Sequence, residues 1–536
     1  MSSNVKPVSK NTDVDERFGA LLSNAAAIRA ISSAIEGTLG PKGLNCMLVD
    51  RFGDVVVTND GSTILDRIDA AHPAARMLIK TAKAQDDEVG DGTTTATILA
   101  SALISEGVSH VARGVPVTKI IEGLRLGVER AREFIERSAR KLSGPEDPLL
   151  WRTALIAGRQ HKDIADLVVE AAKLIDPDKL TDPAFKLSRT VIAKEGAENQ
   201  VFTGLIVDKT RANRQMPKSV EDVRLLVIDG ALEPEQVEDD ALSTESGFAR
   251  YMQLQNEFRG NVRKIADLGI KLIVAAKGID DFAEELLTDA GVMAIRRVSS
   301  KDIERIVEHT GARTLKRSGL KKEPEELERF IGTCRRVFED ERLEHIRIEG
   351  GGGRPMATIL VGASTQEVKD ERERIAEDAA AAVQAALKGG VVAGGGAVEV
   401  AAAREVQRLR DSVRGMAAYG VDCVAEALRK PLMQIVANAG FNPLEKVEDV
   451  IAAQAKHPEC VTVAQAKHPE PVEGCAALGI DCDTGEVADM LELGVVDPLP
   501  VKLHALRAAA EVAEAVLRIN TIIRKRDDGN SPEPAG

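Results

Sequence analysis

The run Gly90-Asp91-Gly92-Thr93-Thr94-Thr95-Ala96-Thr97 groups residue types that suit a magnesium-bound polyphosphate. Its glycines let the backbone approach an anion closely, because they carry no side chain. Consecutive threonines supply hydroxyl donors at the predicted start of a helix, where unpaired backbone N–H groups also point at an anion. The Asp91 carboxylate offers the hard oxygen ligand that Mg²⁺ prefers. The run predicts a phosphate and metal site, although a Gly-Asp-Gly sequence taken alone is more often a plain turn.

A second glycine-rich loop and a second loop carboxylate occur earlier in the sequence. The loop is Thr38-Leu39-Gly40-Pro41-Lys42-Gly43, and the turn Asn59-Asp60-Gly61 presents the carboxylate. Ordinary turns between helices and a hairpin remain the alternative for these residues judged in isolation. The chain contains no Gly-Lys dipeptide, which excludes the usual P-loop.

Helices and short strands are predicted to position these loops. Apolar residues recur at helical spacing over Phe18–Ile35, and the glycines and proline of the loop that follows stop that helix. Cys46–Asp50 and Asp54–Thr58 are predicted as the strands of a hairpin. This hairpin delivers Asp60 to the end of a strand.

The composition and the predicted secondary structure of the chain change twice along its length. Ser143–Pro148 is the first clear break after an alanine-rich helical part. From Val201 strand-like blocks alternate with helices, which predicts an α/β section that closes at Gly350–Gly353. Long helices then return, Val501–Arg524 being the last, and Arg524–Gly536 is predicted to be disordered. Further predicted strands are Phe202–Val207, Val223–Ile228, Lys271–Ala275 and Gly291–Ala294, and further helices are Lys162–Ile175, Asp281–Asp289 and Asp302–His309.

Length and charge limit the function classes. A chain of 536 residues exceeds one ordinary hydrophobic core, so two or three domains are expected. The formal net charge of -14 argues against a nucleic-acid partner, which would require a basic face. Met1–Asp13 is polar and does not resemble a leader, and no apolar run is predicted to span a bilayer. We therefore expect a cytoplasmic protein without a membrane partner.

The cysteines show no Cys-x-x-Cys pair and no metal-ligand spacing, so free thiols are expected. His457 and His468 near two of the cysteines suggest zinc as an alternative. Both histidines, however, lie in a copied segment, found at Ala453–Glu459 and again at Ala464–Glu470. A tandem duplication in a surface loop explains them better than selection for ligands. The cysteines are Cys46, Cys334, Cys423, Cys460, Cys475 and Cys482.

An ordered series of motifs runs through nearly the whole chain. Its members are Met47–Asp50, Gly53–Gly61, His72–Ala75, Val89–Ala96, Gly278–Asp281, Ala294–Val298, Val392–Glu399 and Thr484–Pro498. This series resembles the group II chaperonins, the thermosome and eukaryotic cytosolic type. The duplicated loop and one shortened stretch resemble a divergent branch, the bacterial group II-like chaperonins that are sometimes called group III.

The resemblance implies a chaperonin fold, which is a multidomain α and α/β architecture. Residues 1–140 and 392–536 would form one helical equatorial ATP-binding domain, because motifs from both ends must meet one nucleotide. Residues 141–207 and 356–391 would form a small intermediate hinge domain. Residues 208–355 would form an α/β apical domain that binds substrate.

The resemblance also implies ATP and Mg²⁺ as ligands and assigns residue roles. Asp91 would ligate Mg²⁺, and Asp60 would lie near the attacking water. Asp378 would orient and activate that water from a hinged domain, so that hydrolysis reports domain closure. Without the motif, Asp378 would be taken for a solvated helix carboxylate. The implied nucleotide-binding residues are Thr38, Leu39, Gly40, Pro41, Gly92, Thr93, Thr94, Thr95, Gly395, Asp481 and Asp497.

One stretch departs from the family pattern. Group II chaperonins carry a lysine that senses the γ-phosphate, within the part that corresponds to Thr153–Ala165. This part is shorter here. Arg159 or Lys162 could substitute for the lysine, and the sequence does not choose between them.

Ser246–Phe258 concentrates aromatic residues in a chain that is poor in them. An ordinary core face of a helix is one explanation. By resemblance, residues of about 240–262 form a helical protrusion that serves as a built-in lid, so that no separate co-chaperonin is needed. The residues that could share one helical face are Phe248, Tyr251, Met252 and Phe258. On the next helix, Phe282, Leu286 and Leu287 are candidates for a substrate-facing surface.

These features together predict an ATPase subunit of a double-ring chaperone that self-assembles and encloses unfolded proteins. A metabolic ATP-dependent enzyme is one alternative, but the apical section shows no acceptor-site constellation. A ring scaffold without hydrolysis is the other, and the altered sensor stretch keeps it open. The number of subunits per ring and the natural substrates do not follow from the sequence.

Overall fold

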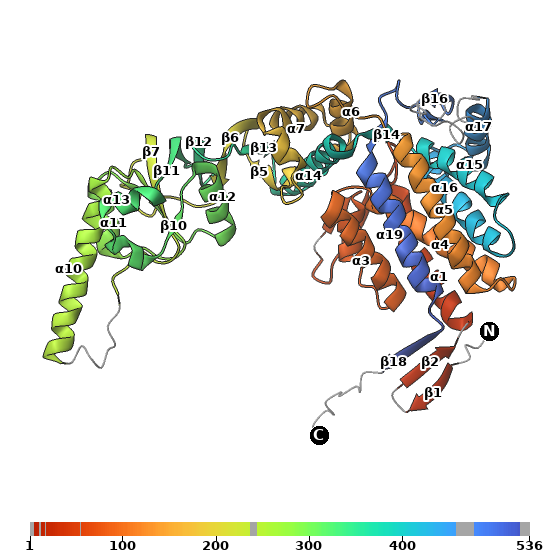
Figure 1. Ribbon diagram of the computed structural model, residues 1–536, viewed down its shortest axis with the longest axis horizontal. Coiled ribbons are helices and arrows are strands. Elements are labelled where there is room, and N and C mark those ends of the chain that lie inside the picture. The colour runs from red at the N-terminus through yellow and green to blue at the C-terminus, as the bar shows by residue number, and fades with distance from the viewer. Residues whose placement is uncertain are drawn as a thin grey trace. The chain divides into compact units, whose positions relative to one another are not determined.

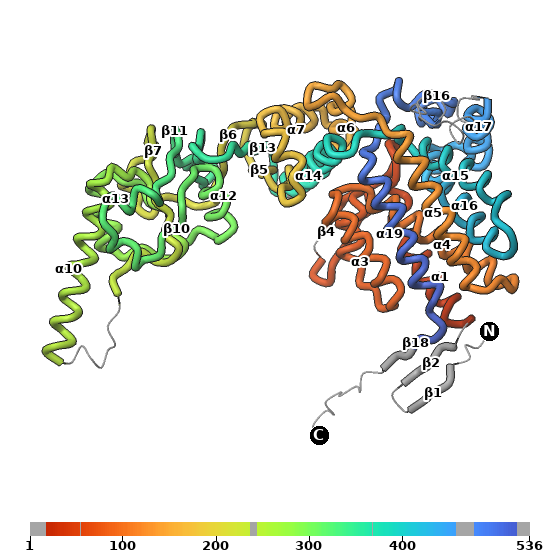
Figure 2. The backbone as a smooth tube through the Cα atoms, in the orientation of Figure 1, coloured from red at the N-terminus to blue at the C-terminus, as the bar shows by residue number. Residues whose placement is uncertain are grey.

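A computed structural model describes residues 5–9, 12–16, 18–53, 55–235, 244–456 and 476–525 (Figure 1). The chain divides into two compact units, whose segments are interleaved along the sequence as the colour gradient of Figure 2 shows. The first unit comprises Met1–Val169, Lys186–Ser188 and Ile375–Gly536, and the second comprises Glu170–Phe185 and Arg189–Arg374. The division into three domains that the resemblance implies, with its bounds, remains a prediction.

Long helices build the first unit, and residues from both ends of the chain share its hydrophobic core. Helix α4 (Thr93–Ala112) packs against α1 (Phe18–Ile35), α16 (Ala417–Asn438) and α19 (Leu499–Leu517). Helix α5 (Val117–Arg137) packs against α16 and α19. Burial of the apolar stripe of each helix stabilises this arrangement.

Helix α1 has the bounds that its apolar periodicity predicts. By length and composition alone, Phe18–Thr38 would also suit a membrane span, and 44% of its most apolar window is buried. This is weak support for a span, because core helices share both features, and residues such as Ile28 and Ile35 lie fully buried in the core.

Shorter elements complete the first unit. Its strands form a two-stranded hairpin, two further strand pairs and one three-stranded sheet in the order β1-β2-β18. The strands are β1 (Val5–Ser9), β2 (Thr12–Glu16), β3 (Cys46–Val49), β4 (Val55–Thr58), β14 (Val391–Ala393), β15 (Leu478–Ile480), β16 (Val487–Asp489), β17 (Val496–Pro498) and β18 (Thr521–Lys525). The helices are η1 (Glu36–Thr38), α2 (Gly61–Arg67), α3 (Pro73–Val89), α6 (Pro148–Ala157), α15 (Ala397–Arg410) and α17 (Pro443–Ala455).

A mixed nine-stranded sheet organises the second unit, in the order β5-β13-β6-β12-β11-β7-β8-β9, with β10 paired to β7. Alternating residues of β7 face opposite sides, so Leu226 packs against α10 and α11 while Leu225 packs against α12. The strands are β5 (Val191–Glu195), β6 (Gln200–Val207), β7 (Ser219–Ile228), β8 (Leu272–Ala275), β9 (Met293–Ile295), β10 (Thr314–Leu315), β11 (Gly332–Asp340), β12 (His345–Gly351) and β13 (Ala357–Ala363).

The helices of the second unit lie mostly on the faces of this sheet. They are α8 (Pro177–Thr181), α10 (Glu245–Asp267), α11 (Asp281–Asp289), α12 (Ser300–Thr310), η3 (Arg317–Lys321), α13 (Pro324–Leu327) and η4 (Glu328–Phe330). Helices α7 (Lys162–Leu174) and α14 (Gln366–Gly389) run from one unit into the other, as does η2 (Leu187–Thr190).

Helix α10 contains the aromatic stretch, and its apolar residues divide between two environments. Phe258 lies in the core of the second unit at 5% exposure, as an ordinary core face would. Phe248 and Met252 are 58% and 43% exposed, and the Phe248 ring lies against that of Tyr251. The helix therefore has a packed base and an apolar, exposed N-terminal part.

Two sequence predictions are wrong. The helix predicted over Val501–Arg524 ends at Leu517, and the β-branched residues that follow form β18, which pairs with β2. Leu287 does not reach a substrate surface, because it is fully buried between α11 and the sheet. The other predicted helices and strands are present with small changes in their bounds. The second copy of the duplicated segment and most of the predicted tail lie outside the described residues.

Candidate functional site

The predicted phosphate loop lies between α3 and α4 of the first unit. Gly90 and Gly92 both adopt left-handed backbone conformations, with φ of 68° and 80°. A Cβ on Gly92 would lie 2.7 Å from the Val501 side chain, so this position requires glycine. No side-chain hydrogen bond caps α4, which begins at Thr93. The first N–H groups of α4 therefore remain available to an anion.

Asp91 is held at the centre of this loop by several hydrogen bonds. The Gly92 N–H donates to Asp91 Oδ1 at 2.5 Å. The fully buried Gln85 donates from Nε2 to the Asp91 carbonyl at 2.8 Å. Burial, followed by the charge of Asp497, raises the pKa of Asp91 from 3.8 to about 6. A nearby cation would favour the ionised form, which fits the predicted role as a metal ligand.

The turn that carries Asp60 lies against the first turn of α4. Asp60 caps α2, accepting hydrogen bonds from the N–H groups of Ser62 at 3.4 Å and Thr63 at 2.7 Å. A Cβ on Gly61 would lie only 2.4 Å from the Thr94 hydroxyl. Gly61 and Thr94, which helices α2 and α3 separate in the sequence, therefore approach each other closely.

The second predicted loop, Thr38–Pro41, is held by the C-terminal end of α16. The Asn438 amide donates to the carbonyls of Glu36 at 2.9 Å and Leu39 at 2.8 Å. Gly40 has φ of 88°, and a Cβ there would lie 3.1 Å from the Ile435 side chain. The side-chain amide of Asn438 therefore fixes the backbone of this loop.

The glycine run at Gly394–Gly396 and Asp497 lie side by side. Pairing of β14 with β17 sets Val392 opposite Asp497. A Cβ on Gly394 would lie 3.1 Å from Asp497 Oδ2. Gly395 has φ of 62°, so the chain turns sharply beside this carboxylate. Two of the implied nucleotide-binding segments, the glycine run with Gly395 and the strand with Asp497, thus adjoin each other.

A buried ion triad surrounds Asp497. Lys502 Nζ lies 2.7 Å from Asp497 Oδ2 and 2.7 Å from Glu399 Oε1. The side chains of Lys502 and Glu399 are 10% and 3% exposed. Although burial opposes it, the two carboxylates together raise the pKa of Lys502. Lys502 therefore stays charged and fixes Asp497 through one oxygen.

The Asp481 carboxylate stabilises the turn that follows β15. Its carboxylate accepts from the Asp483 N–H at 2.9 Å and from the Thr484 hydroxyl at 3.1 Å. The neighbouring Asp483 pairs with Lys42 at 2.6 Å, which links this turn to the Gly40 loop. Asp481 thus shapes the turn with its side chain.

Asp378 lies on α14 in the first unit, beside Arg159. One oxygen of Asp378 is 3.4 Å from an Arg159 guanidinium nitrogen. Burial raises the pKa of Asp378 well above its ordinary value, and the charge of Asp60 raises it further, whereas Arg159 lowers it. Asp91 and Asp86 add to the rise. These predicted catalytic and metal-binding carboxylates therefore share one region.

The donor set around Asp91 fits Mg²⁺ better than a metal that requires several protein ligands. Within the described ranges, no group of three or more His, Cys, Asp or Glu residues is arranged to hold a metal ion. Mg²⁺ typically takes one or two carboxylates and completes its shell with water and phosphate oxygens. Asp91 would supply such a carboxylate. Of the residues that suggested zinc, His457, Cys460, His468 and Cys475 lie outside the described part of the chain.

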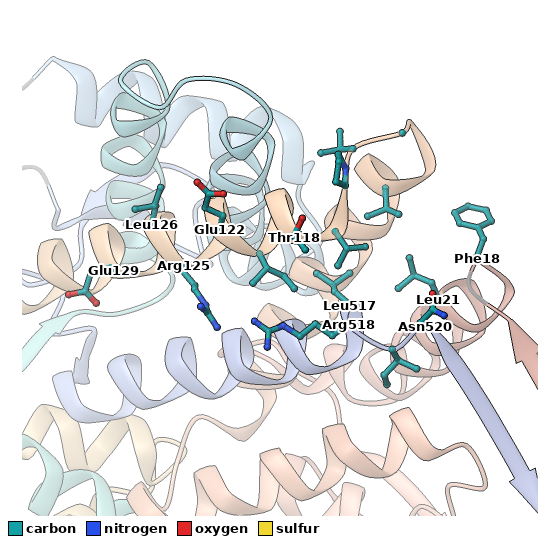
Figure 3. A pocket seen from close by; sticks show the side chains of 17 residues that line it. Phe18, Leu21, Thr118, Glu122, Arg125, Leu126, Glu129, Leu517, Arg518 and Asn520 are labelled. Carbon is teal, nitrogen blue, oxygen red and sulfur yellow. The ribbon is translucent and has the colours of Figure 1, made fainter.

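A cavity of about 1260 Å³ lies elsewhere in the first unit. Figure 3 shows Phe18 and Leu21 from α1, Leu126 and Arg125 from α5, and Leu517 at the end of α19 around it. None of the predicted site residues lines this cavity. It therefore forms no part of the candidate nucleotide site.

The sequence analysis did not identify several residues that fix the candidate site residues through hydrogen bonds or ion pairs. Gln85, Asn438 and Lys502 belong to no quoted motif, Glu399 ends the motif Val392–Glu399 without an assigned role, and each acts through another residue. A signal exists for the charged pair, because Glu399 and Lys502 interrupt apolar helical runs, and a buried charge needs a partner. Asn438 offers no such signal, since amides are common near helix ends.

Comparisons with known proteins match nearly the whole chain. Residues 31–527 match the model of the TCP-1/cpn60 chaperonin family. The chain is 34% identical to a thermosome subunit of Methanopyrus kandleri over 519 residues, covering 94% of this chain and 92% of that protein. It is 35% identical to a thermosome subunit of Pyrococcus abyssi over 518 residues, covering 93% and 90%. A crystal structure of a group III chaperonin in the open state matches with a TM-score of 0.84 and 45% identity, covering 95% of this chain and 99% of that chain.

Proposed function

The chain belongs to the TCP-1/cpn60 chaperonin family, and from this premise we propose that it is an ATP-hydrolysing chaperonin subunit whose site uses Mg²⁺. Its fold is the chaperonin fold, and its function is that of an ATP-dependent chaperone that forms a ring complex. The similarity to a group III chaperonin fits the bacterial group II-like branch that the shortened stretch suggested.

One observation carries the ATPase proposal. The charges of Asp60 and Asp91 both act on Asp378, although the three residues come from distant parts of the sequence. Gly61 moreover touches the first turn of α4. Carboxylates gathered at an uncapped helix N-terminus suit a metal-bound polyphosphate and an attacking water.

We assign the binding of ATP to backbone and hydroxyl groups around this turn. The N–H groups and hydroxyls of Thr93–Thr95 would bind phosphate oxygens, with Thr38–Pro41 packed over them. Gly395 and Asp497 would contact the nucleoside, Lys502 leaving one Asp497 oxygen for the ribose hydroxyls. Mg²⁺, held by Asp91, supplies charge neutralisation for the phosphate oxygens when it is bound.

Asp60 and Asp378 would position the attacking water for in-line displacement of ADP. A carboxylate whose pKa is raised above its ordinary value is a better proton acceptor at neutral pH, and the pKa of Asp378 is raised by burial and by Asp60. Asp378 would accept the proton of the water as its oxygen bonds to the terminal phosphorus. Hydrolysis then depends on the position of one aspartate on α14.

The exposed part of α10 supports a role with other proteins. Phe248 and Met252 present apolar side chains to solvent, which unfolded chains or neighbouring subunits could cover. We propose that this helix contributes to a built-in lid, so that no separate co-chaperonin is required. We further propose that the subunits form stacked rings, which enclose unfolded substrates in the cytoplasm.

Replacing Asp378 by Ala tests the catalytic assignment. Mg-ATP binding should persist, while turnover should fall at least about a hundredfold, the usual contribution of a positioned base. Asp370→Ala is the matched control, because Asp370 is exposed on the same helix, and this variant should turn over like the wild type. Unchanged turnover in Asp378→Ala would contradict the role of Asp378. Binding without turnover in the wild type would favour a ring scaffold.

A further inference from the structure

The buried Gln85 side chain connects the phosphate loop to helix α19. Its Nε2 donates to the Asp91 carbonyl at 2.8 Å and to the Val501 carbonyl, on α19, at 3.3 Å. A Cβ on Gly92 would lie 2.7 Å from the Val501 side chain and 3.1 Å from Gln85 Nε2. The loop therefore packs directly on this amide, and the orientation of the amide affects where the Asp91 backbone lies.

The oxygen of the Gln85 amide meets a histidine. Gln85 Oε1 lies 2.5 Å from Nδ1 of His504, which belongs to α19. Carbonyl oxygens only accept hydrogen bonds, so the amide nitrogen must face the carbonyls of Asp91 and Val501. The amide oxygen then faces His504, and it needs a donor there. The arrangement therefore requires a proton on His504 Nδ1.

The charge state of His504 agrees with this assignment. Burial and the charge of Arg507 lower the pKa of His504, while Glu88 and Glu511 act in the opposite direction. A neutral imidazole carries one N–H group, so at neutral pH the Nδ1–H form donates to Gln85 and Nε2 can only accept. The charged imidazolium also carries a proton on Nδ1. The donor is therefore present in either charge state.

We propose that His504 is a positioning residue of the phosphate loop, whose Nδ1–H holds the Gln85 amide in the orientation that fixes the Asp91 backbone. Without this donor, the buried Gln85 oxygen would be left unsatisfied, or the amide would rotate and turn its oxygen toward the Asp91 carbonyl. Either change would release the peptide group that carries the proposed metal ligand, because buried polar groups are costly to leave unpaired. His504 thus acts on Mg-ATP binding through Gln85. This inference rests on the proposed ATPase function.

Variants of His504 separate this role from simple packing. His504→Leu and His504→Phe both remove the donor, with side chains of different size, and the ring borders a cavity of about 490 Å³ that leaves space for either. His504→Asn keeps a donor, because the side-chain nitrogen of asparagine is bonded to Cγ as Nδ1 of histidine is. Glu511→Gln is the control, since the Glu511 side chain is 73% exposed on the same helix.

Steady-state kinetics with Mg-ATP and melting temperatures measure the outcome. His504→Leu and His504→Phe should raise the KM about tenfold, the effect of one hydrogen bond lost by a buried group, while kcat changes less than about threefold. His504→Asn should bring the KM back to within about threefold of the wild-type value, and Glu511→Gln should match the wild type. If His504 only stabilises the fold, both variants that lack the donor will melt earlier and keep the wild-type KM. That result would contradict the inference.

A double variant tests whether the effect passes through the amide. Once Gln85→Leu has removed the amide, His504 has nothing to hold, so Gln85→Leu combined with His504→Leu should have the KM of Gln85→Leu alone. Additive increases in KM would contradict the inference. If the wild type hydrolyses ATP and the variants without the donor keep the wild-type KM, this inference fails alone. If the wild type neither binds nor hydrolyses Mg-ATP, the proposed function fails together with it.

Discussion

At the scale of single residues, the site depends on buried charges that are stabilised by one another. Lys502 forms ion pairs with both Glu399 and Asp497 in surroundings where an unpaired charge would be costly. Asp91 and Asp378 lack so close a balance, and burial raises the pKa of both. Ionised carboxylates in this state would be stabilised by the arrival of a metal ion. The charge pattern thus fits the metal ion that we propose for this site.

The raised pKa of Asp91 predicts how magnesium-dependent binding changes with pH. The pKa is about 6 rather than 3.8, so the protonated form, which cannot ligate a metal, predominates below pH 6. Affinity for Mg-ATP should fall about tenfold for each pH unit below this value, as binding competes with one proton. Calorimetric titrations at pH 7 and pH 5 would measure the change. Asp91→Asn should bind weakly at both values, and a wild-type affinity that is constant over this range would contradict the assignment.

At the scale of elements, the site is built by helix ends. The N-terminus of α4 faces the predicted phosphates, Asp60 caps α2, and the last turn of α16 holds the Gly40 loop. Helix ends combine rigid backbone with unpaired polar groups, so they can present donors without cost to the core. The loops between these ends are short and closely packed.

The contact between α16 and the Gly40 loop gives a prediction of its own. Asn438→Ala removes two hydrogen bonds to loop carbonyls, so the loop should lose its fixed conformation in the free protein. We expect the KM for ATP to rise about tenfold while kcat changes less than about threefold, because the loop binds rather than reacts. Steady-state kinetics would show the split.

A matched amide serves as control for this prediction. Asn442 caps α17 through its side chain, away from the loop. Asn442→Ala should therefore lower stability slightly and leave the KM unchanged. If both variants raise the KM equally, the effect of Asn438 is general destabilisation and not loss of loop positioning.

The sequence predicts helices and strands correctly where the local residue pattern is strong. The prediction fails where pairing with a distant chain segment determines the secondary structure. Helix α1 and helix α11 have the predicted bounds, because apolar periodicity and clear stop signals mark them. β18 was missed, since its strand conformation depends on pairing with β2 from the other end of the chain. Leu287 was misassigned for a related reason, because helical spacing alone does not tell a core face from a surface face.

Motifs likewise suggest candidate site residues but not the residues that hold these candidates in place. Asp60, Asp91 and Asp378 carry recognisable neighbours in sequence, whereas Gln85 and Asn438 matter only through hydrogen bonds across the fold. The ion pair of Arg159 with Asp378 also required coordinates, since Arg159 and Lys162 are both basic residues of one short stretch. A single sequence does not show which distant residues are in contact.

At the scale of the whole molecule, both ends of the chain contribute to one core, with Leu21 and Val516 in the same cluster. The second unit is an insertion between these ends, organised by its own sheet. The β3–β4 hairpin exposes Met47, Val49 and Phe52, which is unusual for a monomer and suits a subunit that contacts others. The architecture therefore fits a chain that works within a ring.

Recovery of a chemically denatured, unrelated enzyme tests the central claim most directly. Its activity would be followed with this protein present, with Mg-ATP, with ADP and without nucleotide, beside the Asp378→Ala variant. The account predicts that recovery requires both Mg-ATP and Asp378, with little recovery from ADP. Suppressed aggregation without ATP-dependent recovery, or equal recovery by Asp378→Ala, would contradict it.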